Sequence, residues 1–512
     1  MNESMNSTFS SASRRIFIAA LAMWSAVSAV YAAGDATDQA KSLTLRECIE
    51  RTLENNLEIR SQRINPTIGT WGVVGAQGIY DPLLSAGINY ADSITPAQFV
   101  GVATNGLLST QPVKEQQLQS GGTLSGLLPS GATYGLSATD TRFSGNTRSN
   151  FLYTGSAGAF LSQPLLKNFG FSVNSATIRI ARESKTIAVQ NFVQFVMSKI
   201  SAVSTAYYEL IYAIENHKTA VENRELAQEL LDQNRKREQV GTMSPLDVIQ
   251  AEAGVAESEQ NVILTARTIK DNENTLKRLI CQQVTEFRGV SLVPVDQPLV
   301  QMVALDVGES TRTALQMRAD YLSTLHALES QNISVQFNRN QLWPEINLQG
   351  SYGYNGAGRT FDSFGNSVAS GDNPFWSIGV VASFPLGDRQ ARSTYHIAKL
   401  DADQALLALK SLEQDIIVEV DNAVGHVETN LKSVEAARAA TRLAEESLDA
   451  EKKKLLAGTS TTFLVLQAQT QLATARSAES RAEADYGESL VNLDLVEGTI
   501  LQKNNIVLDE KF

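Results

Sequence analysis

Two short segments of this chain are alike and lie 217 positions apart. They are 240–248 (VGTMSPLDV) and 457–465 (AGTSTTFLV), and long glycine-poor sequence typical of helices flanks each of them. In the first segment, Gly241 is the residue type that ends a helix in the left-handed conformation, Ser244 can N-cap the next helix, and Pro245 fits its first turn. The pattern predicts two helical hairpin tips, and a chain that makes one hairpin twice is predicted to be a duplication.

The N-terminus has the pattern of a secretory signal peptide, which we place at residues 1–32. Arg14 and Arg15 precede an apolar run, and small residues follow up to Ala32 and Ala33. The apolar run is short for a membrane anchor, so we expect cleavage near these alanines. No later segment has enough uninterrupted apolar residues for a membrane-spanning helix. If the protein crosses a membrane, it must do so with strands.

Composition excludes several classes of function. The formal net charge is −12, and an acidic exported chain is a poor candidate for nucleic-acid binding. Cys48 and Cys281 are the two cysteines, which we expect to be buried thiols, although the exported compartment would permit a bridge. The four histidines have no second ligand four positions away, and no phosphate-binding loop is present. We therefore predict no metal, no cofactor and no catalytic residue.

Strand patterns occur in both halves of the chain. In the second half, apolar and polar residues alternate over 346–354 and again over 375–384, with a Gly/Asn/Ser/Asp-rich stretch between them. In the first half, a strand opens at 80–82 and shows the same alternation over 84–90, and a later strand is predicted around 156–162. Tyrosine and tryptophan near the strand ends suit a lipid interface. Two strand regions, 82–164 and 344–385, are therefore predicted.

The two strand regions differ in length. Pro164 and Pro385 both lie where strand gives way to helix, and they are 221 positions apart. The first region spans 82 residues from Pro82, and the second spans 41 from Pro344, so the first holds 41 extra. Within the excess, a Leu-Pro-Ser-Gly turn separates two candidate strands in 123–143. We predict an additional β-hairpin, and a long structured loop is the alternative.

Long helical stretches follow each strand region. Neither proline nor glycine occurs from Val173 to Gln239, and the next helix is predicted from Pro245 to about Ile280. Apolar residues recur every seven positions in that second helix, which specifies a left-handed coiled coil. The stripe and the residues 217 positions later are Val248, Val255, Val262, Ile269 and Leu276, and Val465, Leu472, Glu479, Tyr486 and Leu493. We interpret the stripe as coiled-coil core.

Together these features predict two repeats after the signal peptide. Residues 33–300 form repeat 1, with a helix, the strand region 82–164, a long helical hairpin over 173–280 and a linker over 281–300. Residues 301–512 form repeat 2, with a helix, the strand region 344–385, a long helical hairpin over 387–500 and a C-terminal tail.

The chain resembles the TolC-like outer-membrane efflux protein family, also called outer membrane factors. The match begins at 43–48 (LTLREC), continues through both strand regions and both Gly-Thr tips, and ends near 498–500 (GTI). The resemblance implies an α+β membrane protein with two internal structural repeats. In it, a long coiled-coil α-barrel in the periplasm joins a transmembrane β-barrel that trimerisation completes, with a small belt formed by 281–310 and both termini.

Physical reasoning supports trimerisation, because four to six strands cannot close a barrel with an aqueous channel and an open sheet edge cannot face lipid. The trimer would have eighteen strands if the extra hairpin joins the barrel and twelve if it does not. The implied function is a passive exit duct in the outer membrane of a Gram-negative bacterium, within a tripartite efflux or type I secretion system. Its implied partners are a periplasmic adaptor, an inner-membrane transporter and outer-membrane lipid, and the protein is not expected to be an enzyme.

The resemblance also suggests a periplasmic gate. Asp247 lies where the family has an acidic residue that holds the tip closed, although a helix-capping role explains it equally well. Where well-known members carry an aspartate ring, this sequence has Leu464 and Gln467, and the arginine and tyrosine that lock the aperture correspond to Ser460 and Leu455. We therefore predict an apolar constriction at Leu464 that is gated by poor wetting.

The two tips match the family's adaptor-binding grooves, although they could be turns alone. The residues concerned are Val240, Gly241, Thr242, Ala457, Gly458 and Thr459. The alternative function is a periplasmic coiled-coil adaptor or scaffold, which the strand regions argue against. The sequence does not identify the cargo or the class of transporter.

Overall fold

The computed structural model describes residues 39–96, 112–146, 150–296 and 305–508, so the predicted signal peptide lies outside the described residues. The chain divides into two compact units. Unit 1 comprises Met1–Arg60, Met197–Leu305 and Asn422–Leu495, and unit 2 comprises Ser61–Val196, Asp306–Asp421 and Val496–Phe512. The long helices α6 (Ala176–Gln239) and α11 (Arg389–Leu456) contribute residues to both units.

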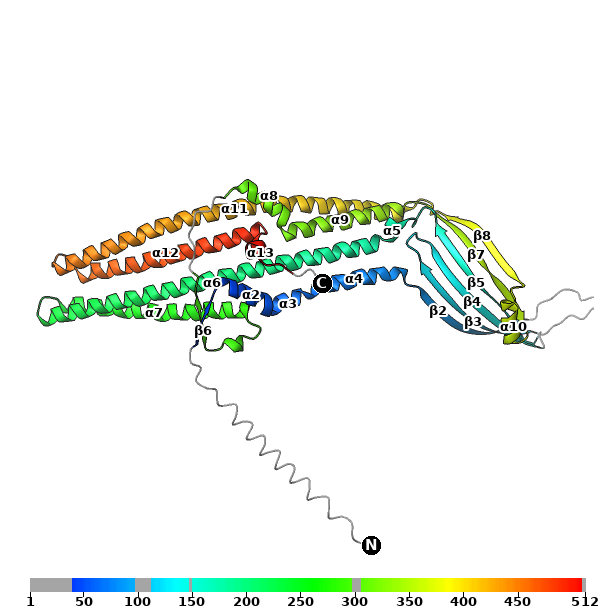
Figure 1. Cartoon of the computed structure of the whole chain (residues 1–512), viewed down its shortest axis with the longest axis horizontal. Coiled ribbons are helices and arrows are strands. Elements are labelled where there is room, and N and C mark those ends of the chain that lie inside the picture. The colour runs from blue at the N-terminus through cyan, green and yellow to red at the C-terminus, as the bar shows by residue number, and fades with distance from the viewer. Residues whose placement is uncertain (1–38, 97–111, 147–149, 297–304, 509–512) are drawn as a thin grey trace, which may run out of the picture. The chain divides into compact units, whose positions relative to one another are not determined.

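Unit 1 contains two helical hairpins that lie side by side (Figure 1). One joins α6 to α7 (Pro245–Ile280), and the other joins α11 to α12 (Thr462–Val496). The remaining elements of this unit are β1 (Gln39–Leu43), α2 (Leu45–Asn55), η2 (Val284–Phe287) and β6 (Val290–Pro294), with α3 (Leu57–Gln62) at its boundary. The predicted helix bounds near 239, 245 and 280 are confirmed. No helix among the described residues is both long and apolar enough to cross a membrane.

The predicted coiled-coil stripe is largely confirmed. Val248 and Leu276 are buried, and the stripe residues between them on α7 are half-buried. On α12, Glu479 breaks the apolar stripe and lies 3.8 Å from the guanidinium of Arg438 on α11. A second buried row that the sequence did not reveal lies three positions after the stripe on α7 and includes Ser258 and Thr265. Small polar side chains therefore share this core with the apolar ones.

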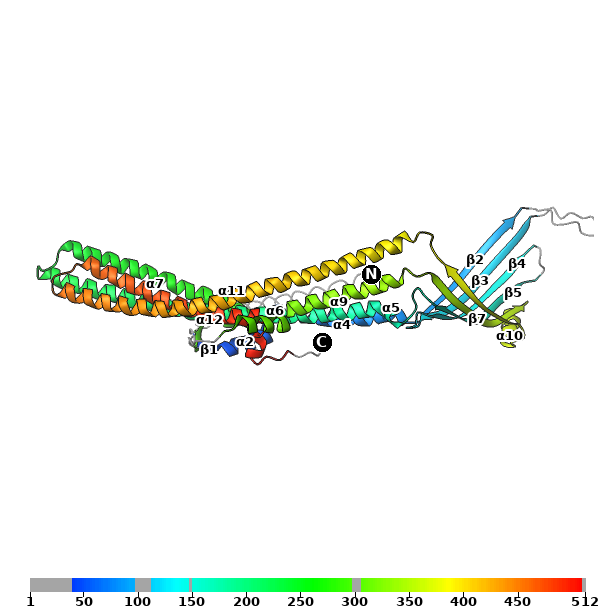
Figure 2. The same ribbon diagram turned by 90° about the horizontal axis from the view of Figure 1, so that it is seen from above.

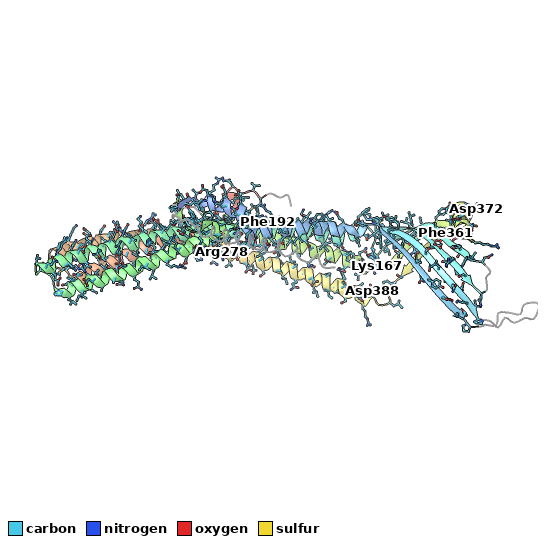
Figure 3. All side chains as sticks on the ribbon, turned by 90° about the horizontal axis from the view of Figure 1, so that it is seen from below. Lys167, Phe192, Arg278, Phe361, Asp372 and Asp388 are labelled. Carbon is cyan, nitrogen blue, oxygen red and sulfur yellow. The ribbon has the colours of Figure 1, made fainter. Side chains whose placement is uncertain are left out.

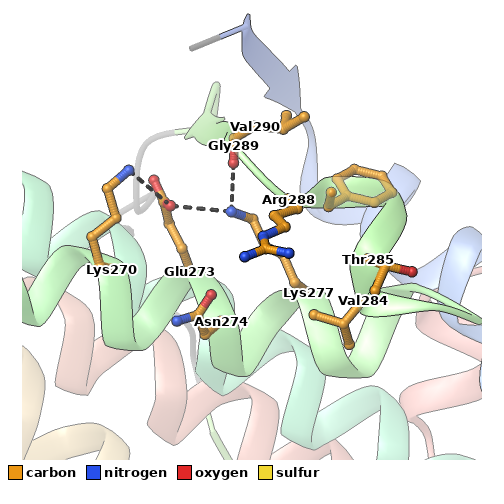
Figure 4. A pocket seen from close by; sticks show the side chains of 10 residues that line it. Lys270, Glu273, Asn274, Lys277, Val284, Thr285, Arg288, Gly289 and Val290 are labelled. Atoms are coloured by element: carbon orange, nitrogen blue, oxygen red, sulfur yellow. Dashed lines mark hydrogen bonds and ion pairs between the residues drawn. The ribbon is translucent and has the colours of Figure 1, made fainter. Parts of the chain in front are cut away.

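A buried ion pair anchors β6 to α7 (Figure 4). Glu273 is 1% exposed, accepts a hydrogen bond from Ser291 at 2.7 Å and pairs with Lys277 at 3.3 Å. Burial alone would raise the pKa of Glu273, but the Ser291 hydrogen bond and the Lys277 charge outweigh it and hold that pKa below its usual value. Lys277 also donates to the carbonyl of Val290. Because β6 pairs in parallel with β1, the same contact fixes the described N-terminal segment.

Unit 2 is built on one six-stranded antiparallel sheet, which Figure 2 shows from a second direction. Its strands in spatial order are β2 (Leu83–Thr95), β3 (Val113–Leu127), β4 (Thr133–Gly145), β5 (Leu152–Pro164), β7 (Glu345–Gly358) and β8 (Pro374–Ser383). The helical elements of this unit are α4 (Ile64–Gln77), η1 (Gly78–Tyr80), α5 (Phe171–Asn174), α8 (Val307–Met317), α9 (Ala319–Asn340), α10 (Phe361–Ala369) and α13 (Ile500–Lys503).

The extra hairpin of the first strand region consists of β3 and β4, and both are interior strands of the sheet. Their connection is tight, since Gly131 donates to the carbonyl of Leu128 at 2.8 Å and has a φ of 93°. A residue with a Cβ would be strained at this φ. The predicted hairpin is thus confirmed, and the alternative of a structured loop is wrong.

The sheet has one apolar face and one polar face. One row of directly opposed residues on the apolar face crosses all six strands, and it consists of Leu84, Leu124, Leu136, Ala159, Tyr352 and Trp376. The neighbouring row on the opposite face consists of Ser85, Thr123, Ser137, Gly158, Gly353 and Phe375, which are polar or small except for Phe375 on β8. The predicted alternation therefore holds for most of the sheet, with exceptions on both faces. Phe160 of β5 lies on the polar face, and Ser120 and Asp140 lie on the apolar face.

The helix α10, which the sequence did not reveal, lies within the polar stretch between β7 and β8. Thr360 caps it, with Ser363 completing a capping box. Phe364 is buried and packs on Gly356 and Gly358, which belong to the apolar face of β7. Figure 3 labels Phe361 in the first turn of α10, and its ring makes an edge contact with Tyr153 of β5 at 6.2 Å between centroids. The helix therefore packs on one end of the apolar face, over β5 and β7, and leaves the rest of that face exposed.

Cys48 is a buried thiol that belongs to no disulfide. Burial, followed by the negative charge of Glu47, raises its pKa to about 12. Cys281 is also buried and ends α7. The prediction of buried thiols instead of a bridge is confirmed.

A charged cluster joins α6 to α12 within unit 1. Arg481 lies 2.7 Å from Glu209 and stacks on the ring of Tyr212, with 5.2 Å between the guanidinium carbon and the ring centroid. Glu488 lies 3.8 Å from the same guanidinium. Burial and the negative charge of Glu209 raise the pKa of Glu488 to about 7, because one arginine cannot neutralise every carboxylate around it.

This cluster predicts a pH-dependent gain in stability for Glu488→Gln. The pKa of Glu488 is higher in the folded than in the unfolded state, so protonation of this carboxyl favours the folded state. The stabilisation from the protonated carboxyl is complete below about pH 4.5 and is lost as pH rises through about 7. The melting temperature of the variant should therefore match the native protein at pH 4.5 and exceed it at pH 8. The control is Glu446→Gln, which removes an exposed charge on α11. An equal effect of Glu488→Gln at both pH values would contradict the prediction.

Candidate gate and docking tips

The tip between α6 and α7 is a turn with a fixed geometry. Gly241 has a φ of 74° and donates to the carbonyl of Glu238 at 2.8 Å, while Thr242 donates from its backbone to the carbonyl of Arg237 at 2.9 Å. This pair of bonds is the Schellman motif, in which the last carbonyls of a helix are satisfied by the residues that follow it. The left-handed glycine predicted from the sequence is confirmed.

The tip between α11 and α12 repeats that geometry bond for bond. Gly458 has a φ of 75° and donates to the carbonyl of Leu455 at 3.2 Å, and Thr459 donates to the carbonyl of Lys454 at 2.9 Å. The hydroxyl of Thr459 adds a bond to the same carbonyl, as the hydroxyl of Thr242 does for Arg237. Both turns are therefore set by local hydrogen bonds.

The two tips differ in how the next helix begins. Ser244 caps α7, accepting from the backbone of Asp247 at 3.2 Å and donating to the Asp247 carboxylate at 2.7 Å. In the second tip, Thr461 accepts from the backbone of Leu464 at 3.4 Å, and Leu464 has no carboxylate to complete the exchange. The Ser244 cap is confirmed, and Asp247 supports it through the Ser244 hydroxyl and not through the backbone bond of a full capping box. The role of Asp247 in a gate stays a prediction.

The predicted adaptor and gate positions are mostly exposed in the single chain. Val240 is 73% exposed and Leu464 is 42% exposed, and Gln467 is exposed as well. Ala457 and Gly458 are exposed beside them on the second tip. These side chains make few contacts within their own chain, which leaves them available for contacts with other chains.

A polar seam holds the two hairpins together behind the tips. Asn234 of α6 is 1% exposed and donates to the hydroxyl of Thr462 on α12 at 3.0 Å. Gln469 of α12 is 2% exposed and donates to the carbonyl of Leu226 on α6 at 3.2 Å. Arg237 donates to the carbonyl of Leu455 at 3.3 Å. Sequence reasoning missed this seam, although polar residues at buried heptad positions were a usable signal.

The seam surrounds a small apolar core. Its buried members are Leu230, Leu448, Leu455, Val465, Ala468 and Leu472, and Met243 packs against them from the first tip. The side-chain carbonyl oxygens of Asn234 and Gln469 are buried without a hydrogen-bond partner among the described groups. A buried polar atom without a partner costs about 1–3 kcal/mol. The contact between the hairpins is therefore weaker than its burial suggests.

The described residues contain no cluster of three metal-type side chains. The tips present backbone groups, threonine hydroxyls and exposed apolar side chains. This chemistry suits protein–protein contact and the lining of a pore.

Comparison with known proteins matches most of the chain to one family. The family model described as "Outer membrane efflux protein" matches residues 123–282 and 311–499. The chain is 24% identical over 279 residues to outer membrane protein OprJ of Pseudomonas aeruginosa, covering 53% of this chain and 55% of OprJ. It is 23% identical over 318 residues to outer membrane protein TolC of Escherichia coli, covering 60% of this chain and 62% of TolC. The matched part thus spans less than two thirds of either relative.

Solved structures resemble the whole fold. The outer-membrane channel OprN gives a TM-score of 0.67 at 18% identity, covering 91% of this chain and 96% of OprN. The CmeC outer membrane channel of Campylobacter jejuni gives 0.65 at 17% identity, covering 91% of this chain and 90% of CmeC. The outer membrane protein VceC of Vibrio cholerae gives 0.64 at 17% identity, covering 89% of this chain and 96% of VceC.

The tip geometry predicts opposite effects for two kinds of glycine. Gly241→Ala should lower the free energy of unfolding by about 1 kcal/mol, because alanine is strained at positive φ. No atom lies within 4 Å of the added Cβ, so the loss would reflect backbone strain alone. The control is Gly425→Ala on α11, where the Cβ also meets nothing but the backbone is helical, and a gain of about 0.5–1 kcal/mol is expected. Thermal unfolding of the purified protein compares them, and a loss in both variants would contradict the interpretation.

Proposed function

The chain belongs to the outer membrane efflux protein family, and on that basis we propose that it is a passive exit duct in the outer membrane of a Gram-negative bacterium. In this proposal, three copies form one channel, which receives cargo from an inner-membrane transporter through a periplasmic adaptor. The duct serves a tripartite efflux or type I secretion system. Energy for transport comes from the partner, and the protein itself conducts.

The observation that carries the proposal is the sheet of unit 2. Its apolar face, with the row from Leu84 to Trp376, matches a lipid-facing surface, and its polar face matches the wall of an aqueous lumen. Along both of its edges, β2 and β8 expose large apolar side chains such as Ile88 and Ile378. An unpaired edge is not tolerated in lipid, so β8 of one copy must meet β2 of another.

We further propose that the two halves of the chain are repeats, over 33–300 and 301–512. Helices α2 and α8 each have 11 residues and end at a buried polar residue with extended backbone, Asn56 (φ −66°, ψ 119°) and Arg318 (φ −66°, ψ 124°). These two residues are 262 positions apart, as are Pro82 and Pro344. Together with the equal tips, the shared break in the helix supports a duplication.

The tips are proposed as the periplasmic mouth of the duct and the docking surface for the adaptor. Three chains would bring six tips together around one pore. Each tip exposes a glycine backbone that a partner can approach closely, beside an exposed apolar side chain such as Val240. The belt of the family would be formed by β1, β6 and the segments that adjoin them.

We propose that Leu464 forms an apolar constriction at this mouth. It occupies the position equivalent to Asp247 and lies exposed in the first turn of α12. Three copies of an exposed leucine around the pore axis would exclude water from a narrow aperture. Gln467, one turn further along the same helix, would line the pore behind it.

Replacement of the gate residue tests both the channel and its closure. Leu464→Ala should raise the conductance of the closed state in planar bilayers several-fold, because a smaller side chain widens and wets the aperture. Phe463→Ala is the matched control, since Phe463 is exposed on a different side of the same helical turn. An unchanged closed state would exclude the constriction, while a protein that forms no channels at all would exclude the duct.

The alternative is a periplasmic adaptor or scaffold, and contacts of the tips decide between the two. A photo-reactive amino acid at Val240 or Ala457 should cross-link to a co-expressed periplasmic adaptor, because both positions are exposed at the tips. The control position is Leu386, which is 99% exposed beside the sheet. Cross-links from Leu386 equal to those from the tips would contradict docking at the tips, and fractionation with the inner membrane would favour the scaffold.

A further inference from the structure

The extra hairpin lies at a definite place in the chain. Corresponding landmarks of the two halves are 262 positions apart before the sheet, at Pro82 and Pro344, but 221 apart after it, at Pro164 and Pro385. The difference of 41 residues falls between β2 and β5. This is where β3 and β4 lie, so the first half contributes four strands to the sheet and the second half contributes two.

The hairpin is a structural part of the sheet. Thirteen residue pairs join β2 to β3, from Leu83 with Ser125 to Thr95 with Val113, and thirteen more join β3 to β4. Eleven pairs join β4 to β5. Removal of β3 and β4 would therefore separate β2 from the rest of the sheet. A hairpin outside the wall of a barrel would not carry this continuous pairing.

The insertion of two strands keeps the two edge strands of the sheet antiparallel to each other. Because six antiparallel strands are an even number, β2 and β8 run in opposite directions, and β8 of one copy can pair with β2 of the next in the antiparallel sense. One added strand would make the two edges parallel, whereas one added hairpin keeps them compatible. The sheet can therefore close with neighbours in the same way with or without the insertion.

From this pairing we propose that the membrane part of the duct is an eighteen-stranded barrel, with six strands from each of three copies. This inference rests on the proposed function, because it takes from it the number of copies. With strands 4.8 Å apart and tilted by about 40°, eighteen strands give a backbone diameter of about 36 Å, against about 24 Å for twelve. An eighteen-stranded barrel encloses an aqueous channel, so the exit admits bulky hydrated cargo.

The polar face leaves this lumen open. Its central residues on β3 and β4 are small, among them Gly121, Ser137 and Thr139. The aromatic residues on this face include Phe160 of β5 and Phe375 of β8, which lie against glycines of the neighbouring strands, and in a barrel about 36 Å across they leave the centre of the lumen open. The helix α10 packs on the opposite face, against Gly356 and Gly358, and so it does not occupy the lumen. The size limit for cargo is then set at the helical tips, and the outer-membrane exit passes whatever the tips admit.

The test compares the native protein with a hairpin deletion. In the deletion variant, Thr95 is joined to Leu152 by an Asn-Gly turn, which leaves β2 and β5 antiparallel and gives four strands per copy. Electron cryo-microscopy of the native trimer in lipid nanodiscs should show eighteen strands, and the variant should show twelve. Twelve strands in the native trimer, with the hairpin outside the wall, would overturn the inference and leave the proposed duct intact.

Size-selective labelling measures the width of the exit directly. Gln349→Cys places a thiol on the polar face of β7, and Leu348→Cys places one on the apolar face as the matched control. A maleimide carrying a polymer about 20 Å across, added to intact cells, should label Gln349→Cys in the native barrel and not in the deletion variant, because side chains narrow the about 24 Å barrel further. A small hydrophilic maleimide should label Gln349→Cys in both and Leu348→Cys in neither.

Each outcome separates the inference from the proposed function. Exclusion of the large reagent from the native barrel, with entry of the small one, would overturn the wide exit. Absence of trimers from the outer membrane would overturn the proposed duct itself. If the deletion variant does not assemble, the strand count and the labelling of the native protein decide the question without it.

Discussion

In a bilayer, every backbone N–H and C=O must be hydrogen-bonded within protein, and this constraint governs how unit 2 can exist. Four of its six strands are paired on both sides, whereas β2 and β8 each leave one edge of polar groups open. Each unsatisfied group costs several kcal/mol in hydrocarbon. Both strands also carry exposed apolar side chains, which favour a position of these edges within the hydrocarbon of the bilayer. Pairing of both edges with further strands is therefore a condition for this sheet to be stable in a membrane.

The helical hairpins of unit 1 are not under this constraint, because water can hydrogen-bond to their polar groups. The α6–α12 contact accordingly mixes ion pairs, such as Arg481 with Glu209, with buried amides such as Asn234. An amide in an apolar core favours one register, since any other pairing leaves more of its groups unsatisfied. The charged cluster around Glu488 adds a dependence on pH that an apolar contact would not have.

Local rules made much of this fold predictable from sequence. The left-handed glycines, the Ser244 cap and the strand alternation depend on residues near in sequence, and all were found. The charged cluster joins Glu209 to Glu488, 279 positions away, and no local pattern reveals such a contact. The helix α10 is nine residues long and lies in a polar stretch, so its apolar residues at 361, 364 and 368 were too few to stand out. That β3 and β4 are interior strands of the sheet depends on pairing, which alternation alone does not specify.

The hydrogen bonds of the two turns and of the seam between the hairpins indicate which of these parts can move more easily. Both turns have their last carbonyls satisfied by two backbone bonds and a threonine hydroxyl, so a change of shape there would break local bonds without forming others. The seam between the hairpins is held by Asn234 and Gln469, each with one buried oxygen left unpaired. Opening the seam would expose both oxygens to water, and their hydration would offset part of the free energy needed to separate the hairpins. Movement of one intact hairpin against the other is therefore the least costly way for the tips to change their positions, and the turns would move with their helices.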